Sequence, residues 1–255
     1  LALWGSNIDD LALLTRPKEK ALSEAYKVLE MLGAVNQQLQ ITKKGRSLSK
    51  IPSHPRLAKI ILAGGKDATL LASILSNSDP LNNMNNSDIN VRISSIRNYQ
   101  NQRSDSSYSL KVPVVKEIIK EMSRLSKHLT NQSDYTIAQL AALAYPDRIG
   151  KRREGRAPRY ILSNGKGAKM AESDPLRSVP FLVACKLDGN LQEAKLRQCL
   201  PITLPEIKEL FGNQIISLQT CEWSKRQKKV LAKRQEKLGQ LILEEKFWQD
   251  APNNL

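Results

Sequence analysis

The hydrophobic pattern of this chain changes from helical to strand-like spacing along its length. Between Leu11 and Leu32, apolar residues recur every three or four positions after Pro17, which is typical of an amphipathic helix. From Arg159 onward, short apolar runs are separated by Gly, Pro, Asn and Asp, which predicts strands joined by turns. We therefore expect an α+β fold in which a helical part precedes a small antiparallel β barrel.

The helical part is predicted to contain two domains. The Leu11–Leu32 helix, a short strand at Leu39–Thr42 and a basic turn at Lys43–Arg46 have the order of a small winged helix, assigned to residues 1–53. Short helices then predict a helical bundle over residues 54–134. His54, Asp67 and Thr136 are expected to cap helices. The Asn/Ser-rich tracts 76–86 and 101–109 are expected to be long or partly disordered loops, with a faint helical signal between them.

The strand-rich part is assigned to residues 135–250. A turn signal at Leu187–Asn190 separates two of its strand candidates. For the basic stretch after Trp223, periodicity leaves a strand pair and a solvated helix both open. The predicted strands are Arg159–Lys169, Phe181–Leu187 and Ala194–Leu200, with Ile215–Trp223 and Val230–Leu243 as weaker candidates.

The charge of the chain points to a polyanionic partner. Its 40 Lys and Arg against 25 Asp and Glu give a net charge of +15. No apolar run approaches the ~20 residues of a spanning helix, and the opening residues lack a signal-peptide pattern, so we predict a soluble, cytoplasmic protein with no membrane partner. Residue 1 is Leu, and the apolar opening is typical of the middle of a helix, so we expect a fragment of a longer protein.

Composition and motifs predict no catalytic, metal or cofactor site in this chain. The phosphate-binding pattern G-x-x-x-x-G-K-[ST] is absent from the sequence, and Asn164–Gly167 only approaches it. The two His and three Cys residues have no metal-ligand spacing. Asp147, Asp174 and Asp188 lie in turn contexts, where Asp accepts hydrogen bonds from nearby backbone.

A basic, Gly-rich hairpin is the strongest candidate site. Arginine forks suit phosphate, and glycines let a phosphate approach main-chain amides. Tyr160 is a candidate for base stacking, with a strand-core role as its alternative, and Lys151–Arg153 could instead be an ordinary solvated surface run. The candidate nucleic-acid contacts are Arg152, Arg153, Arg156, Arg159, Lys166 and Lys169.

These same segments resemble the C-terminal half of the HrpB-type ATP-dependent RNA helicases, a branch of the DEAH-box helicases. The resemblance rests first on Ala144–Ile149 with Arg152 and Arg153, and on Tyr160–Ala168. It also covers Asp174-Pro175-Leu176, Leu187-Asp188-Gly189, His54–Ala58, Leu32-Gly33-Ala34 with Leu39–Thr42, and Ala2–Gly5. It implies a winged helix, a helical ratchet domain, an oligonucleotide-binding (OB) fold and the start of the family's own C-terminal domain.

The resemblance further implies an accessory region that binds single-stranded RNA beside the helicase motor domains. ATP and magnesium would then bind in the motor, which this chain lacks, so the chain alone should not be an enzyme. Two alternatives stay open, a self-contained winged-helix regulator that binds nucleic acid and a protein-interaction scaffold derived from a helicase. The first is disfavoured because the polar face of Leu22–Leu32 offers chiefly Glu24, Lys27 and Glu30, and its two acids would repel phosphate.

Overall fold

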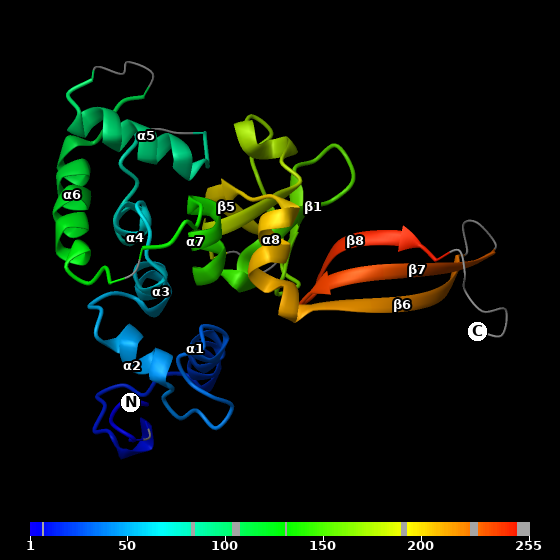
Figure 1. The fold of residues 1–255 in the computed structure, drawn as a ribbon, viewed down its shortest axis with the longest axis horizontal. Coiled ribbons are helices and arrows are strands. Elements are labelled where there is room, and N and C mark those ends of the chain that lie inside the picture. The colour runs from blue at the N-terminus through cyan, green and yellow to red at the C-terminus, as the bar shows by residue number, and fades with distance from the viewer. Residues whose placement is uncertain are drawn as a thin grey trace. The chain divides into compact units, whose positions relative to one another are not determined.

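The computed structural model describes residues 1–6, 8–82, 85–103, 108–130, 132–189, 193–224 and 229–248. The chain forms two compact units, one of helices and one rich in strands (Figure 1). Leu1–Asn83 and Asn90–Ala144 make up the first, and Met84–Ile89 and Tyr145–Leu255 make up the second. The α+β class is confirmed. The three predicted domains, with boundaries after residues 53 and 134, stay a prediction beside this division after Ala144.

The first unit is helical in its described residues. Its core is built from α3, α4, α6 and α7, whose apolar faces bury Ile60, Leu71, Ile118 and Leu140 completely. The elements are η1 (Ile8–Asp10), α1 (Glu19–Met31), α2 (Lys43–Ser49), α3 (Pro55–Ala63), α4 (Ala68–Ser76), α5 (Ile89–Gln100), α6 (Val112–Ser126) and α7 (Ile137–Ala144).

The N-terminal segment departs from the predicted winged helix. The first long helix is predicted with Pro17 in its first turn, and it begins close to there, at Glu19. In place of a strand at Leu39–Thr42 there is one bridge, Val35 to Ile41, because the Asn36 side chain accepts the N–H groups of Gln38 and Gln40 and bends the chain into a loop.

The predicted basic turn at Lys43–Arg46 is also wrong, because these residues open helix α2. The Thr42 hydroxyl accepts the Gly45 N–H at 2.9 Å and so caps this helix. Gly45 must lack a side chain, since a Cβ there would lie 2.0 Å from the Ala34 carbonyl oxygen. Thr42 and Gly45 thus set both the start of α2 and its close contact with the preceding loop.

Capping explains where the bundle helices begin. His54 Nδ1 accepts the Arg56 N–H at 3.2 Å, and the Thr136 hydroxyl accepts the Gln139 N–H at 3.1 Å, so both predicted caps are confirmed. Asp67 stands before α4 but does not cap it, because its carboxylate pairs with Arg97 instead. The buried Arg56 guanidinium donates to the Ala144 carbonyl oxygen at 2.8 Å, which ties α3 to the end of α7.

A buried ion pair holds α5 in the first unit. The Arg92 side chain is 2% exposed, and its Nη2 lies 2.6 Å from Asp79 Oδ2. The described parts of the two Asn/Ser-rich tracts pair with each other, since the Asn82 N–H donates to the Ser109 carbonyl oxygen at 3.0 Å. Residues 83, 84 and 104–107 of these tracts, and Asn131 of the predicted linker, lie outside the described residues.

The second unit begins with a closed five-stranded barrel in the order β1-β2-β3-β5-β4. Neighbouring strands are antiparallel except β3 and β5, which are parallel, so the predicted barrel is confirmed with this one departure. Tyr160, Leu162, Leu182 and Leu196 are among the side chains that fill it. Its elements are η2 (Pro146–Arg148), β1 (Ile149–Arg152), β2 (Arg159–Leu162), β3 (Gly167–Lys169), η3 (Pro175–Ser178), β4 (Phe181–Leu187) and β5 (Ala194–Pro201).

A three-stranded antiparallel sheet follows the barrel through helix α8 (Leu204–Phe211) and η4 (Gly212–Gln214). Its strands are β6 (Ile215–Ser224), β7 (Lys229–Leu238) and β8 (Leu241–Phe247), drawn in orange and red in Figure 1. The turn between β7 and β8 contacts the barrel, because the Gln240 N–H donates to the Ser163 carbonyl oxygen at 2.9 Å. For the basic stretch after Trp223, the sequence leaves a strand pair and a helix open, and the described residues form strands. Lys225, Arg226 and Lys228 are not among the described residues.

The Arg92–Asp79 pair generates a prediction about the stability of the helical unit. Asp79→Ala leaves a buried guanidinium without its carboxylate, and we expect it to lower the free energy of unfolding by about 3 kcal/mol. The matched control is Asp9→Ala, which breaks the exposed Asp9–Arg16 pair and should cost at most about 1 kcal/mol. Urea unfolding followed by far-UV circular dichroism measures both. Equal losses would show that burial of Arg92 does not matter.

Candidate nucleic-acid interface

Along each barrel strand, side chains point alternately into the core and toward the outer surface. Along β2, Tyr160 and Leu162 point into the core, while Arg159, the first residue of the strand, is exposed. On β3, Ala168 is buried and Lys169 is exposed. Because successive side chains of a strand point to opposite faces, Arg159 and Lys169 both lie on the outer surface of the barrel.

Strand register places three cations side by side on this outer surface. Arg159 lies opposite Lys169 on the antiparallel β2–β3 pair, and Lys169 lies beside Lys195 on the parallel β3–β5 pair. Neighbouring strands are about 4.8 Å apart, so these three residues form a continuous row, here called the basic row. Exposed Arg197 follows two positions further along β5. The row therefore presents positive charge across three strands.

One carboxylate lies within the basic row. Glu193 Oε1 is 3.2 Å from Arg159 Nε, and Glu193 Oε2 is 3.9 Å from Lys169 Nζ. A single negative charge shared by two cations leaves the surface positive. It also holds the two side chains near each other, so a phosphate that binds there would cost less side-chain entropy.

The loop between β1 and β2 brings further arginines to the same end of β2. Arg153 and Arg156 are exposed there, and the Arg153 N–H donates to the Arg159 carbonyl oxygen at 2.8 Å. Arg152 has a different role, because its guanidinium donates to the carbonyl oxygens of Arg177 at 2.9 Å and Gly155 at 3.1 Å. We conclude that Arg152 holds the loop in place, while Arg153 and Arg156 present their charge to solvent.

Lys166 lies apart from the other candidates. The turn of residues 163–166 joins the far end of β2 to β3, and the Leu162 N–H donates to the Lys166 carbonyl oxygen at 2.9 Å. Arg159 and Lys169, by contrast, lie at the opposite ends of the same two strands. The structure thus brings together Arg153, Arg156, Arg159 and Lys169 but not Lys166.

Sequence reasoning missed two members of this surface, Lys195 and Arg197. Both stand at alternate positions of the strand predicted at Ala194–Leu200, so their exposure could have been inferred from strand periodicity. Their proximity to Lys169 could not, because it depends on a parallel pairing between strands that are distant in sequence.

Tyr160 is a core residue, so the stacking role considered for it is corrected. Its side chain is fully buried, and its hydroxyl donates to the carbonyl oxygens of Leu176 and Val179, both at 3.0 Å. Burial raises the pKa of this phenol to about 12, despite a smaller opposing effect of the Arg152 charge. A base cannot reach this ring.

Two of the three aspartates expected in turns, Asp174 and Asp188, accept backbone hydrogen bonds, while the Asp147 carboxylate lies 3.7 Å from Arg148 Nε. The buried Asp174 carboxylate accepts the Leu176 N–H at 2.9 Å and the Ser87 N–H at 2.8 Å. Asp188 accepts the Lys195 N–H at 2.6 Å. Asn190, at the end of the predicted turn, lies outside the described residues. Within the described part of the chain, no three His, Cys, Asp or Glu side chains are grouped as metal ligands.

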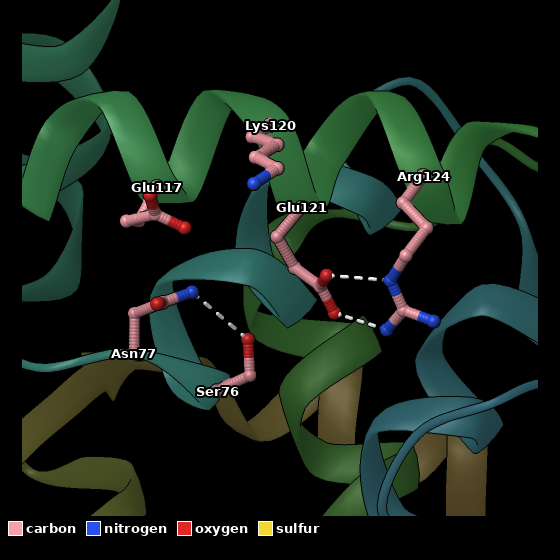
Figure 2. Close-up of a pocket in the computed structure, with 6 residues that line it drawn as sticks. All are labelled: Ser76, Asn77, Glu117, Lys120, Glu121 and Arg124. Carbon is pink, nitrogen blue, oxygen red and sulfur yellow. Dashed lines mark hydrogen bonds and ion pairs between the residues drawn. The ribbon is translucent and has the colours of Figure 1, made fainter.

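The helical unit contains a polar cavity of about 360 Å³ beside α4 and α6 (Figure 2). Glu121 and Arg124 form a two-pronged ion pair at its edge, with nitrogen–oxygen distances of 2.6 and 2.7 Å, and these hydrogen bonds lower the pKa of the Glu121 carboxyl. Two acids and two bases line it, so it offers no net charge to attract an anion. The lining residues are Ser76, Asn77, Glu117, Lys120, Glu121 and Arg124.

Comparison with known proteins supports the resemblance inferred from the sequence. No known family model matches the chain. It is 28% identical over 248 residues to the ATP-dependent RNA helicase HrpB of Escherichia coli, covering 95% of this chain and 29% of that protein. It is also 35% identical over 82 residues to the probable ATP-dependent RNA helicase DHR1 of Saccharomyces cerevisiae, covering 30% of this chain and 6% of that protein.

Solved structures extend this similarity to the fold. A crystal structure of the E. coli DExH-box NTPase HrpB matches 99% of this chain with a TM-score of 0.76 and 26% identity, over 30% of the crystallised chain. The chain is therefore similar over almost its whole length to part of HrpB, as its motifs indicate, and spans less than a third of that relative's length. In the part of the chain that is described, no helix is long and apolar enough to cross a bilayer.

The buried Tyr160 phenol generates a prediction about pH. Its pKa lies near 12 in the folded barrel and near 10 when unfolded, so its stabilising contribution is complete below about pH 10 and is lost as the pH rises toward 12. Tyr160→Phe should be about 2 kcal/mol less stable than the parent at about pH 8, because the one hydroxyl proton that two carbonyl oxygens share is lost and these acceptors lose their donor. This difference should shrink by about pH 11.5.

Urea unfolding of both proteins across this pH range measures the effect. Tyr135→Phe, which removes a more exposed phenol from the helical unit, is the control and should keep the parent's pH profile. A stability difference for Tyr160→Phe that is constant with pH would contradict the assignment.

Proposed function

We propose that this chain, as the C-terminal region of an HrpB-type helicase, is an accessory region that binds single-stranded RNA through the barrel. The observation that carries this proposal is the basic row on β2, β3 and β5. The strand order β1-β2-β3-β5-β4 is that of an OB fold, in which the β2–β3 face and the adjoining loops bind oligonucleotides. Arg159 and Lys169 stand on that face, and Arg153 and Arg156 stand in the β1–β2 loop.

The chemistry of this face favours contact with the RNA backbone over base recognition. Its described Arg and Lys side chains outnumber its carboxylates, Glu193 in the basic row and Glu154 in the β1–β2 loop, and can bind phosphate oxygens through charge-assisted hydrogen bonds. The aromatic ring in β2 belongs to buried Tyr160 and is out of reach of a base. Binding at the barrel should therefore depend strongly on salt and little on sequence.

The remaining parts of the proposal concern what lies outside this chain. The relatives named above are ATP-dependent RNA helicases, and this chain spans 29% of one of them. We infer that ATP and magnesium bind in motor domains, that this chain alone does not hydrolyse nucleotide, and that it guides RNA for such a motor in the cytoplasm. ATP hydrolysis by the purified chain would contradict this view.

Replacing Arg159 and Lys169 together by Ala tests the RNA-binding surface. If each contacts one phosphate, the slope of log affinity against log salt should fall by about 1.4, since each phosphate on a single strand contributes about 0.7. Fluorescence anisotropy of a labelled single-stranded RNA at several salt concentrations measures affinity and slope together.

The matched control is Lys116→Ala with Lys120→Ala, which removes the same charge from the exposed face of α6. It should leave the salt slope unchanged, as should Lys166→Ala at the far end of β2. An equal fall in slope for the α6 control would show that only net charge matters. Preferential binding of duplex DNA would favour the regulator alternative, and no binding at low salt would favour the scaffold.

A further inference from the structure

The outer end of the β6-β7-β8 sheet exposes a tryptophan that the barrel's chemistry does not use. Trp223 on β6 is 62% exposed, and its cross-strand partner Val230 on β7 is 57% exposed. Large apolar side chains usually lie inside a fold, and a Trp left this open at the end of a strand has no packing function in the chain described.

Register defines this surface, here called the Trp223 face. One row pairs Trp223 with Val230, and the next pairs Cys221 with Ala232. The Ala232 carbonyl oxygen also accepts the backbone N–H of Trp248 at 2.9 Å. This bond places Trp248 beside β7, on the side opposite to Trp223 of β6. On the Trp223 face, the small side chains of Cys221 and Ala232 therefore form the row next to Trp223, and Trp248 lies beside Ala232.

The next row inward is cationic. Arg234 lies opposite Gln219 on one side and Lys246 on the other, and the Arg234 guanidinium lies over the Trp248 ring, 5.4 Å from its centre. Both cations are exposed. A positive charge over an indole keeps the ring in place and leaves the other guanidinium hydrogen-bond donors available to a ligand.

Carboxylates on this face are confined to the end near the barrel. Glu236 and Glu244 lie opposite each other there, and both pair with Lys208 of α8, at 2.7 and 2.5 Å. Glu245 lies on the other face of the sheet, with Lys233 at 2.5 Å. From Arg234 outward, the described side chains of the Trp223 face therefore include two cations and two indoles and no carboxylate.

We propose that the Trp223 face is a second contact site for single-stranded RNA, in which a base stacks on Trp223 while Arg234 and Lys246, two rows further along the sheet, bind phosphates further along the same strand. Aromatic rings beside cations are the arrangement by which proteins hold single strands, because every base has a face that can stack. The absence of carboxylates from the described outer rows favours an anionic partner over a basic or neutral one, and the exposed indole favours an anion that carries bases to stack. This inference rests on the proposed function, and it adds base contacts that the barrel lacks.

Trp223→Ala tests the inference. Stacking of one base is worth about a tenfold change in affinity, so the variant should bind a labelled oligo(U) RNA about tenfold more weakly than the parent. Its salt slope should stay unchanged, because no charge is lost. A strand of equal length with abasic sugars should bind the variant and the parent equally, and Trp223→Phe should keep most of the affinity.

Phe247→Ala is the matched control, since Phe247 is 68% exposed on β8 and lies opposite Lys233, on the other face of the sheet. It should not change RNA affinity. Equal losses in both aromatic variants, or a loss with the abasic strand, would overturn base stacking at Trp223. Unchanged RNA binding by Trp223→Ala would overturn the inference and leave a protein partner for this face.

The two proposals fail in different ways. If the Arg159 and Lys169 double variant loses RNA binding but Trp223→Ala does not, the barrel site stands and the Trp223 face does not bind RNA. If the unaltered chain shows no RNA binding at low salt, both proposals are wrong.

Discussion

The hydrogen bonding of the buried Tyr160 hydroxyl is the interaction on which the rest of the barrel surface depends. By donating to Leu176 and Val179, it fixes the segment between β3 and β4 against the barrel core. It also sets which face of β2 is inside, because a strand that buries residue 160 must expose residue 159. The position of Arg159, and through register those of Lys169 and Lys195, follows from this one buried side chain.

Asp174 supports the same arrangement from the other side. Its carboxylate accepts N–H groups from Leu176 and from Ser87, so it joins the η3 turn to residues 84–89, which belong to the barrel unit although helical segments flank them in sequence. The Asp-Pro-Leu motif is thus explained by structure rather than by chemistry. A motif that carries the resemblance to helicases can therefore shape the proposed RNA-binding surface without itself contacting RNA.

Much of the fold could be predicted from local patterns. The predictions that failed did so because a side chain bonds a partner that the hydrophobic pattern does not show. The strand at Phe181–Leu187 was predicted to the residue because Pro180 and Asp188 bound an apolar run. The strand predicted at Leu39–Thr42 was wrong because the Asn36 side chain competes for backbone N–H groups. Asp67 failed as a cap because distant Arg97 takes its carboxylate. The roles of Arg152 and Tyr160 likewise depend on partners far along the chain.

The two proposed surfaces differ in what they can recognise, and the difference follows from where aromatic side chains lie. In the barrel, the phenol is needed to hold a loop, so the outer face is left with cations that bind phosphate. At the outer end of the sheet, the Trp223 indole is exposed, and the partly exposed Trp248 lies against the exposed cation Arg234. The described polar groups of both surfaces are mainly Arg and Lys, which can contact the phosphates of a strand of any sequence. An accessory region built this way would hold RNA of any sequence, which suits a motor that must move along it.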